Sequence, residues 1–156
     1  MSADQLVDAL RDLGWSVTTA ESCTGGLLAA AITEVAGASD VFQRGYVTYS
    51  NDAKHELLGV TLQEIEIFGA VSDEVAASMA SGALSAARAD ISIAITGIAG
   101  PGGSEFKPEG RVCFGLAVMG QPTKAETVEF GALGRARVRA AARDHALELL
   151  LNAVRS

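Results

Sequence analysis

The stretch ISIAI (residues 91–95) is the part of this 156-residue sequence that indicates the fold most directly. Its apolar character is almost unbroken, which is typical of a strand that is covered on both faces of a sheet. A second apolar run, Val112–Met119, predicts another buried strand, and a glycine-rich segment (residues 97–110) separates the two. Strands of this kind need a helical layer on each face, so the sequence predicts a layered α/β domain.

Further helices and strands alternate on both sides of ISIAI. Thr61 and Ser72 are placed to cap two helices, and a hairpin-like turn at residues 120–122 implies at least one antiparallel strand. The other strands are expected at residues 15–20, 41–49 and 126–130, and the other main helices at residues 24–34, 52–58 and 135–154. The length fits one compact domain, so we expect residues 1–156 to form a single α/β unit with a sheet between helices.

Composition and charge exclude several classes of function. The chain has 19 acidic and 12 basic residues, a net charge of −7. A protein that tracks a nucleic-acid backbone needs a basic face, so we expect neither a nucleic-acid partner nor binding to anionic membranes. The first 15 residues lack the features of a signal peptide, and no run approaches the roughly 20 apolar residues that span a bilayer. We therefore expect a soluble, cytoplasmic protein.

The cysteines and histidines are too few and too scattered for a metal centre. Two cysteines, Cys23 and Cys113, and two histidines occur, none of them at ligand spacing. We expect no disulfide scaffold, no metal and no cofactor. Cys23 is a second candidate nucleophile, but the neighbour of an outward-facing Ser22 is expected to point into the core.

The segment TAESCTGG (residues 19–26) carries the first candidate for chemistry. A strand precedes Ser22 and a helix is expected from Thr24, so Ser22 lies at a strand-to-helix turn beside unpaired N–H groups. A serine there can attack a carbonyl while N–H groups stabilise the oxyanion, and Gly25 and Gly26 leave space for a substrate. The alternative, which position alone favours, is that Ser22 or Thr24 only caps the helix.

A nucleophilic serine needs a base, and no Ser-His-Asp set is apparent. Lys54 follows a predicted strand at a second strand-to-helix junction, and a lysine serves as a base where its surroundings favour the neutral form. Tyr49 lies just before it and is placed to relay a proton or to orient a substrate. Both junctions can fall at one edge of the sheet, where ligands of open α/β sheets collect. Taken alone, Lys54 also fits a solvated helix charge and Tyr49 a half-buried strand residue.

Two further features indicate binding of an anion. TGIAGPGG (residues 96–103) follows ISIAI, and a glycine-dense turn after a buried strand can present N–H groups to an anion. Arg135, Arg137 and Arg139 cluster at the start of the last helix, where a guanidinium can clamp a phosphate or carboxylate. A solvated helix face with ion pairs explains the same cluster equally well.

Four strings of this sequence, in this order, resemble the CinA C-terminal domain family: TAESCTGGLLAAAIT, GYVTYSNDAKHELLGV, GAVSDEVAASMASGA and ITGIAGPGG. The resemblance extends from about residue 6 to residue 151. It implies a three-layer α/β/α sandwich with a mixed, mostly parallel sheet. It also implies hydrolysis of the carboxamide of nicotinamide mononucleotide to nicotinate mononucleotide and ammonia.

The resemblance assigns roles to individual residues. It implies that Ser22 is the nucleophile, that Lys54 is its base and that Tyr49 assists them. We expect substrate contacts from Thr24, Gly25, Gly26, Thr96, Gly97, Arg135 and Arg139, and a pyridine mononucleotide as the small-molecule partner. The family's GDR motif reads Leu133-Gly134-Arg135 here, so its aspartate is missing. A homo-oligomer is also expected.

Two other functions stay open at this stage. A non-catalytic module that binds pyridine nucleotides, or an adaptor, would use the same pocket, although the joint presence of Ser22, Tyr49 and Lys54 counts against it. An amidase of the same mechanism with a different amide substrate is equally compatible. The choice between amides depends on pocket shape, which the sequence does not give.

Overall fold

The computed structural model describes residues 2–104 and 106–156, in which helices and strands alternate along the chain. The helices are α1 (Ser2–Leu13), α2 (Leu27–Thr33), α3 (Asn51–Leu58), α4 (Leu62–Phe68), α5 (Asp73–Ala87) and α6 (Arg135–Arg155), with a short 3₁₀ helix, η1, at Ala38–Asp40. The strands are β1 (Val17–Glu21), β2 (Tyr46–Val47), β3 (Ile91–Gly97), β4 (Arg111–Val118) and β5 (Lys124–Glu129).

The five strands form one sheet in the order β2-β1-β3-β4-β5. Strands β2, β1 and β3 pair in parallel, whereas β4 is antiparallel to both β3 and β5. Four strands therefore run in one direction and β4 runs against them, which confirms the mixed, mostly parallel sheet. The predicted hairpin joins β4 to β5, so that Leu116 pairs with Lys124 and Arg111 with Glu129.

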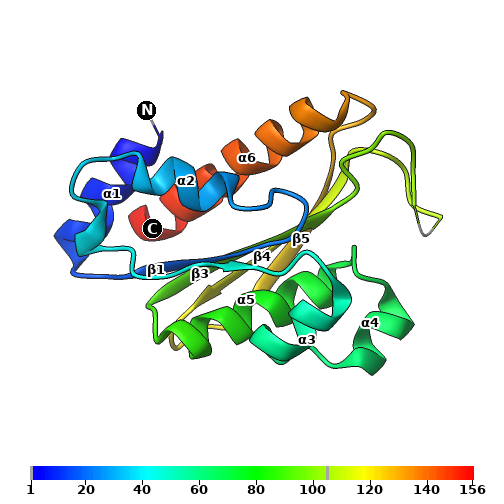
Figure 1. The fold of residues 1–156 in the computed structure, drawn as a ribbon. Coiled ribbons are helices and arrows are strands. Elements are labelled where there is room, and N and C mark those ends of the chain that lie inside the picture. Colours follow the sequence, from blue (N-terminus) through cyan, green and yellow to red (C-terminus); the bar gives the residue numbers. More distant parts are fainter. Residues whose placement is uncertain (1, 105) are drawn as a thin grey trace.

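Helices cover both faces of the sheet in three layers (Figure 1). One face carries α1, α2 and α6, and the other carries α3, α4 and α5. The isoleucines of ISIAI pack with the first group, while Ala94 packs with α5, so β3 is buried on both sides as predicted. Small residues let α5 approach the sheet closely: a Cβ atom at Gly115 would lie 2.1 Å from the Ala76 carbonyl oxygen.

Side-chain caps define the starts of the three helices on the α5 face. Thr61 Oγ1 accepts a hydrogen bond from the Glu64 N–H at 3.1 Å, and Ser72 Oγ accepts one from the Val75 N–H at 3.2 Å, which confirms both predicted caps. Ser50 Oγ caps α3 in the same way. This cap fixes the register of α3 and thereby the side chains of its first turn.

The strand expected at residues 41–49 is largely wrong. Only Tyr46–Val47 forms a strand, paired with the end of β1. The chain before it contacts β1 through an isolated bridge between Val17 and Phe42 and through Thr18 Oγ1, which donates a hydrogen bond to the Arg44 carbonyl at 2.9 Å. Gly45 crosses β1 so closely that a Cβ atom there would lie 2.5 Å from Thr19 Oγ1.

The helix expected from Thr24 begins only at Leu27. Gly25 and Gly26 have φ angles of +56° and +109°, which an α-helix does not contain. The residues between β1 and α2 therefore form an irregular turn that carries Ser22. We call residues 22–26 the nucleophile turn.

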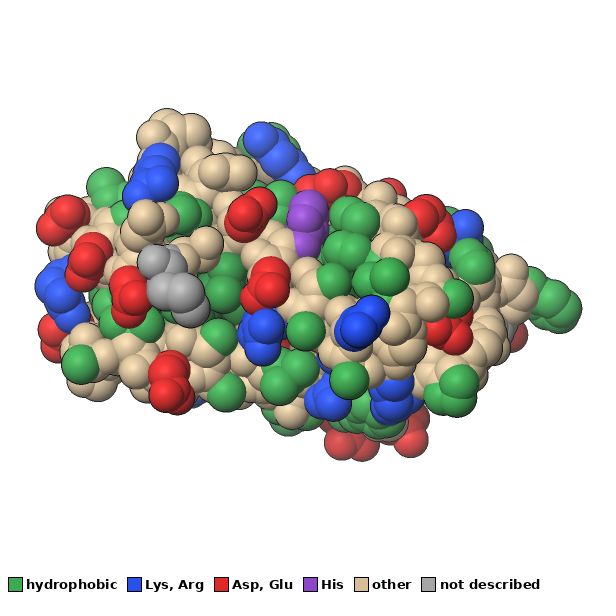
Figure 2. Space-filling view, turned by 90° about the horizontal axis from the view of Figure 1, so that it is seen from above, with side chains coloured by type: hydrophobic (Ala, Val, Ile, Leu, Met, Phe, Trp, Pro, Cys, Tyr) green, Lys and Arg blue, Asp and Glu red, His purple; other side chains and the backbone are tan. Residues whose placement is uncertain are grey.

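The surface carries charges of both signs. On the face formed by α1, α2 and α6, acidic and basic side chains are interspersed (Figure 2), without the continuous basic stripe that a nucleic-acid backbone requires. Within residues 2–104 and 106–156, no helix has both the length and the apolar character that crossing a membrane requires.

Candidate active site

Three loops meet at the edge of the sheet where β1, β2 and β3 end. Because these strands are parallel, their carboxyl ends lie together, as open α/β sheets arrange their ligand sites. A cavity of about 360 Å³ opens there. It is lined by Ser22, Cys23, Tyr49, Asn51, Lys54, Ala70, Val71, Thr96, Gly97, Ile98, Ala99, Gly100, Pro101, Gly102, Gly103, Ser104 and Arg135.

Ser22 and Lys54 are in direct contact within this cavity. Lys54 Nζ lies 2.9 Å from Ser22 Oγ and donates a second hydrogen bond to the Thr48 carbonyl at 3.0 Å. Lys54 is 1% exposed and Ser22 8% exposed, so the pair is shielded from bulk water. Lys54 is therefore not a solvated helix charge. Nor does Ser22 cap α2, because Gly26 occupies that position.

Glu21, a fully buried carboxylate next to Ser22, is a site residue that was not predicted from the sequence. Its oxygens accept hydrogen bonds from the N–H groups of Leu28 and Ala29, at 2.9 and 3.0 Å, in the first turn of α2. The helix N-terminus expected to face the substrate is thus already paired with a protein anion. An acidic residue at the end of a strand that carries no other charge was the available signal.

Cys23 lies beside the nucleophile with its side chain mostly in the core. It is 5% exposed, and burial raises the pKa of its thiol to about 11, which outweighs the opposite effects of a backbone hydrogen bond and of the nearby Lys54 and Arg139 side chains. A thiol of this kind stays protonated near neutral pH. It is therefore a poor nucleophile compared with a serine that has a base in contact.

Thr96 and Gly97 form a wall of the cavity at the end of β3. Thr96 Oγ1 donates a hydrogen bond to the Ala70 carbonyl at 2.8 Å, which ties β3 to the segment before α5. Further along the glycine-rich loop, the Gly102 N–H donates to Glu109 Oε1 at 2.6 Å. At least one of the N–H groups expected to meet an anion is therefore already paired.

Tyr49 and Arg135 meet at the rim of the cavity. One guanidinium nitrogen of Arg135 donates to Tyr49 Oη at 2.8 Å, and another donates to the Gly100 carbonyl at 2.7 Å. Tyr49 is 61% exposed. Its phenol is thus engaged with Arg135, while its backbone carbonyl lies 3.5 Å from Lys54 Nζ.

Four residues expected to contact substrate do not line the cavity: Thr24, Gly25, Gly26 and Arg139. Thr24 is fully buried in the nucleophile turn. Arg139 approaches this turn from α6: its Nε donates to the Cys23 carbonyl at 3.0 Å, and its Nη2 donates to the Thr24 carbonyl at 3.2 Å.

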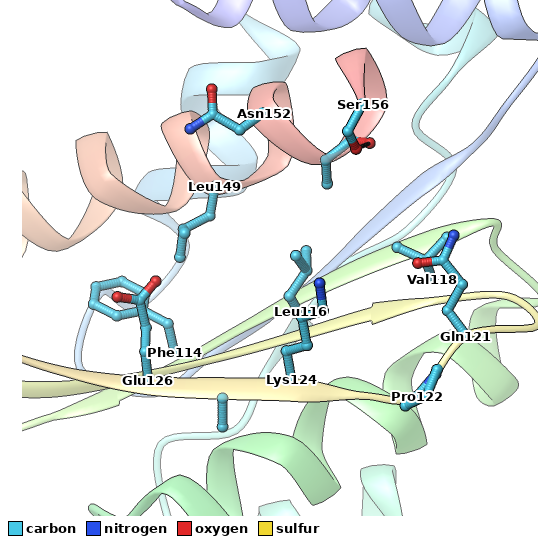
Figure 3. Close-up of a pocket in the computed structure, with 12 residues that line it drawn as sticks. Phe114, Leu116, Val118, Gln121, Pro122, Lys124, Glu126, Leu149, Asn152 and Ser156 are labelled. Atoms are coloured by element: carbon cyan, nitrogen blue, oxygen red, sulfur yellow. Dashed lines mark hydrogen bonds between the residues drawn. The ribbon is translucent and has the colours of Figure 1, made fainter.

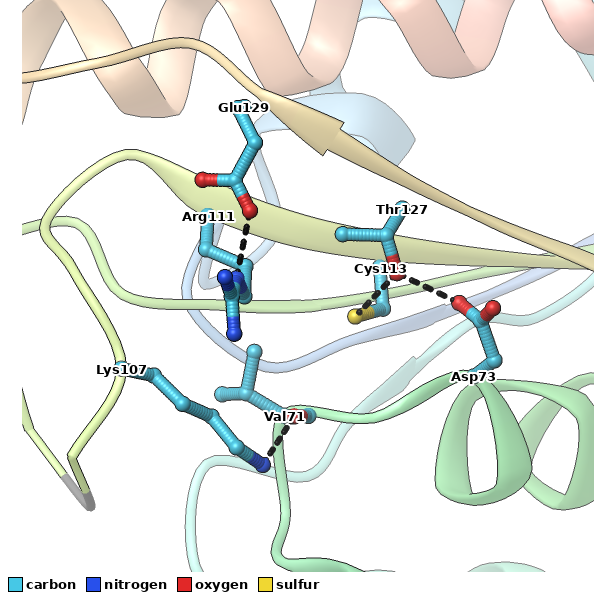
Figure 4. A network of polar contacts seen from close by, with 7 residues as sticks. All are labelled: Val71, Asp73, Lys107, Arg111, Cys113, Thr127 and Glu129. Atoms are coloured by element: carbon cyan, nitrogen blue, oxygen red, sulfur yellow. Dashed lines mark hydrogen bonds and ion pairs between the residues drawn. The ribbon is translucent and has the colours of Figure 1, made fainter.

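A network of polar contacts holds the glycine-rich loop against its neighbours (Figure 4). Lys107 Nζ donates to the Phe68 carbonyl at 3.0 Å and also to the carbonyl of Val71, a residue of the cavity wall. On the adjoining strands, Thr127 Oγ1 donates to Asp73 Oδ1 at 2.6 Å. The cavity wall formed by the glycine-rich loop and Val71 is therefore attached to the segment before α5, and α5 is attached to the sheet through Asp73 and Thr127.

A second hollow, of about 420 Å³, lies between α6 and strands β4 and β5 (Figure 3). Its floor is apolar, with Phe114, Leu116 and Leu149 among the side chains that face it. Its charged members, Lys124 and Glu126, are exposed on the edge strand. It offers no buried nucleophile with a base in contact.

No group of three or more His, Cys, Asp or Glu side chains is gathered as a metal site in the described parts of the chain. The polar side chains that line the cavity include the Ser22 hydroxyl, the Lys54 amine and the Arg135 guanidinium. A hydroxyl in contact with an amine is an arrangement suited to acyl transfer, in which the hydroxyl can serve as nucleophile and the amine as its base.

The fold and the cavity define a three-layer α/β protein with a serine–lysine pair at the carboxyl edge of its sheet. The chain belongs to the CinA C-terminal domain family, whose family model matches residues 1–154. A relative from Enterobacter agglomerans, named nicotinamide-nucleotide amidohydrolase PncC, is 60% identical over 110 residues, covering 70% of this chain and 67% of the relative. The protein of the same name from Escherichia coli K12 is 54% identical over 116 residues, covering 74% and 70%.

Solved structures show the same architecture. The crystal structure of competence/damage inducible protein CihA from Agrobacterium tumefaciens superimposes with a TM-score of 0.94 at 45% sequence identity. The match covers 99% of this chain and 94% of that one. The three-layer α/β/α fold implied by the family resemblance is therefore confirmed.

Proposed function

We propose that this chain hydrolyses the carboxamide of nicotinamide mononucleotide to nicotinate mononucleotide and ammonia, with Ser22 as nucleophile and Lys54 as base. One observation carries the proposal: Lys54 Nζ lies 2.9 Å from Ser22 Oγ, and both side chains are almost completely buried. The choice of substrate rests on the relatives named nicotinamide-nucleotide amidohydrolase PncC, which are 54–60% identical to this chain.

In the first half-reaction, neutral Lys54 accepts the hydroxyl proton while Ser22 Oγ bonds to the amide carbon. Removing an amine from water disfavours its charged form, which allows a lysine to act as a base near neutral pH. The tetrahedral intermediate then breaks its C–N bond, and the Lys54 ammonium returns the proton to the departing nitrogen. Ammonia leaves, and the pyridine carbonyl remains as an ester on Ser22.

In the second half-reaction, water hydrolyses this ester. Lys54, neutral again, accepts a proton from the water as its oxygen bonds to the carbonyl carbon. The C–Oγ bond breaks, Ser22 recovers its proton through Lys54, and the product leaves as a carboxylate. Thr48 supports both steps, because its carbonyl accepts a hydrogen bond from Lys54 Nζ and so orients the amine.

Arg135 is the group that fits the substrate phosphate. Its guanidinium lies at the exposed rim of the cavity, and the chain as a whole carries a net charge of −7. A positive charge at the entrance attracts an anionic substrate, which the net negative charge of the chain otherwise repels. Tyr49, which accepts a hydrogen bond from Arg135, holds this guanidinium at the rim.

The test measures ammonia release from nicotinamide mononucleotide by the wild type and by Ser22→Ala. We expect Ser22→Ala to lose at least about 10³-fold in kcat while remaining folded, because the nucleophile is absent. Ser85→Ala, at an exposed position on α5, is the matched control and should retain full activity. Folded Ser22→Ala protein with the wild-type rate would disprove the mechanism.

The same assay separates the alternative functions. Nicotinamide mononucleotide, nicotinamide riboside, free nicotinamide and NAD carry the same amide on different groups, so their relative rates report the preferred substrate. We expect the mononucleotide to be hydrolysed fastest. Faster release from another amide would assign a different substrate, and binding without any ammonia release would indicate a non-catalytic module.

A further inference from the structure

Two arginines reach the loops of the site from the start of α6, and their contacts differ. Arg135 lines the cavity and is exposed, whereas Arg139 is half-buried and donates to two carbonyls of the nucleophile turn. We propose that Arg139 is a positioning residue that sets the conformation of the turn carrying Ser22, and that it is not a ligand of the substrate phosphate. This proposal rests on the function proposed above.

The contact geometry of Arg139 fixes two consecutive peptide planes. Its Nε lies 3.0 Å from the Cys23 carbonyl oxygen, and its Nη2 lies 3.2 Å from that of Thr24. A guanidinium is planar and its donors form a rigid fork, so both carbonyls must point toward α6 at once. Because a trans peptide directs its N–H opposite to its C=O, the Thr24 N–H is turned away from α6.

The nucleophile turn needs such a restraint. Gly25 and Gly26 both have positive φ, and successive glycines give a chain many accessible conformations. The turn is anchored at its start, where the Ser22 N–H donates to the Ile95 carbonyl at 2.9 Å. Its middle carries the two carbonyls that Arg139 holds. Without the guanidinium, the backbone after Ser22 keeps only its bonds within the turn, from the Gly25 N–H to the Ser22 carbonyl at 3.1 Å and from the Leu27 N–H to the Thr24 carbonyl at 3.0 Å.

The position of Arg139 also keeps it from the substrate. Ser22 and Cys23 line the cavity but Arg139 does not, so the turn lies between the guanidinium and the cavity. A Cβ atom at Gly25 would lie 3.4 Å from Arg139 Nη2, which places the arginine against the back of the turn. Two of its three nitrogens are already used by backbone carbonyls.

The test compares Arg139→Gln with Arg135→Gln on two substrates that share the amide: nicotinamide mononucleotide and nicotinamide riboside, which lacks the phosphate. For Arg139→Gln we expect kcat to fall about 10- to 100-fold, by the same factor on both substrates, since small misplacement of a nucleophile is costly. Its KM for the mononucleotide should change less than about threefold. Arg135→Gln should raise that KM about 10-fold or more, and its effect on the KM for the riboside, which has no phosphate to lose, should be much smaller.

Two measurements separate positioning from general loss of structure. Guanidinium ion added to Arg139→Ala should restore part of kcat, because a free guanidinium can occupy the vacated position between the two carbonyls. Arg139→Lys, which keeps the charge but loses the fork, should stay close to Arg139→Gln in kcat. Thermal unfolding of all variants reports whether they are folded at the assay temperature.

A measurement that uses no amide substrate separates this proposal from the proposed function. A fluorophosphonate labels an activated serine directly, and we expect labelling of Ser22 to slow about 10-fold or more in Arg139→Gln. Equal labelling of wild type and variant, whether fast or absent, overturns the positioning role. So does a raised KM confined to the phosphate-bearing substrate. Wild-type protein that is labelled but releases no ammonia would instead contradict the function.

Discussion

Lys54 is a side chain whose burial the fold alone does not explain. An amine that is 1% exposed has lost nearly all contact with water, and removing a potential charge from water costs several kcal/mol unless its partners compensate. Its hydrogen bonds to Thr48 and Ser22 offset part of this cost. An apolar side chain of the same length would fill the space at a lower cost, which agrees with the catalytic role proposed for Lys54.

Lys54→Met tests this view. The methionine has a similar length but cannot accept a proton, so we expect ammonia release to fall at least about 10²-fold. Removing the buried amine stabilises the protein, whereas losing its hydrogen bond to the Thr48 carbonyl destabilises it. Because these two effects oppose each other, the free energy of unfolding should change by less than about 2 kcal/mol. Urea unfolding and ammonia release on one preparation check both. An active variant, or one destabilised far beyond this, would contradict the interpretation.

The residues of the site differ in how far sequence could identify them. Ser22 and Lys54 lie at strand-to-helix junctions, and parallel strands bring such junctions to one edge. Glu21 and Arg139 act through backbone groups of other segments. The identity of a backbone partner depends on tertiary approach, so no local pattern could have assigned Glu21 to α2 or Arg139 to the nucleophile turn.

Among the elements, α6 begins in a way that explains the missing aspartate of the GDR pattern. Gly134 is the N-cap residue, at φ 93° and ψ 150°, a conformation that only glycine adopts without strain. No side chain of its own can cap the helix. Glu109 supplies a carboxylate from the glycine-rich loop instead: Oε2 accepts from the Gly134 N–H at 3.3 Å, while Oε1 accepts from Gly102.

Introducing the missing aspartate should therefore destabilise this protein. We expect Gly134→Asp to lower the free energy of unfolding by about 1–3 kcal/mol, because the backbone conformation is strained for any side chain and the new carboxylate lies near that of Glu109. Gly134→Ala is the control for strain alone, since no neighbouring atom lies within 4 Å of a Cβ there. An aspartate variant as stable as wild type, or more active, would show that residue 134 accepts a side chain without strain.

The sequence predicts best those elements whose conformation depends on their own residues. Strand β3 carries an apolar run and was found within two residues, and α5 begins directly after its predicted cap at Ser72. The segment at residues 41–49 has the same β-branched character but lies at the edge of the sheet, where its pairing is limited to Tyr46–Val47 and an isolated bridge at Phe42. Edge pairing depends on the neighbour's side chains, here Thr18 and Thr19 of β1, which a local pattern does not include.

At the scale of the whole molecule, the strand order positions the site. With β1 between β2 and β3, the loops that follow all three strands reach one cavity, and α6 spans one face so that its first residues meet the same loops. The sequence indicated a layered α/β domain but not this order. The order follows from which strands pair, and pairing between segments more than 70 residues apart leaves no local signal.

Folding also couples the whole molecule to the protonation of two buried thiols. Desolvation by burial raises the pKa of Cys23 to about 11 from its ordinary value of 9.0, and desolvation raises that of Cys113 as well. The unfolded chain therefore releases these protons at a lower pH than the folded protein does. The contribution of the buried Cys23 thiol to the free energy of unfolding is therefore fully present below about pH 9 and is lost as the pH rises through about 11.

We expect the free energy of unfolding to fall between about pH 9 and pH 11, with about 2–3 kcal/mol of the loss attributable to Cys23. Tyrosines and lysines titrate in the same range, so the comparison must be made with Cys23→Ala and with a Cys23→Ala/Cys113→Ala double variant. Both should be less stable than wild type at pH 7, because a buried sulfur is lost, yet show a shallower decline at alkaline pH. Urea unfolding at half-unit pH intervals measures the slope of each protein. Parallel slopes in all three would mean that the thiols titrate alike in the folded and unfolded chains, and that burial does not protect them.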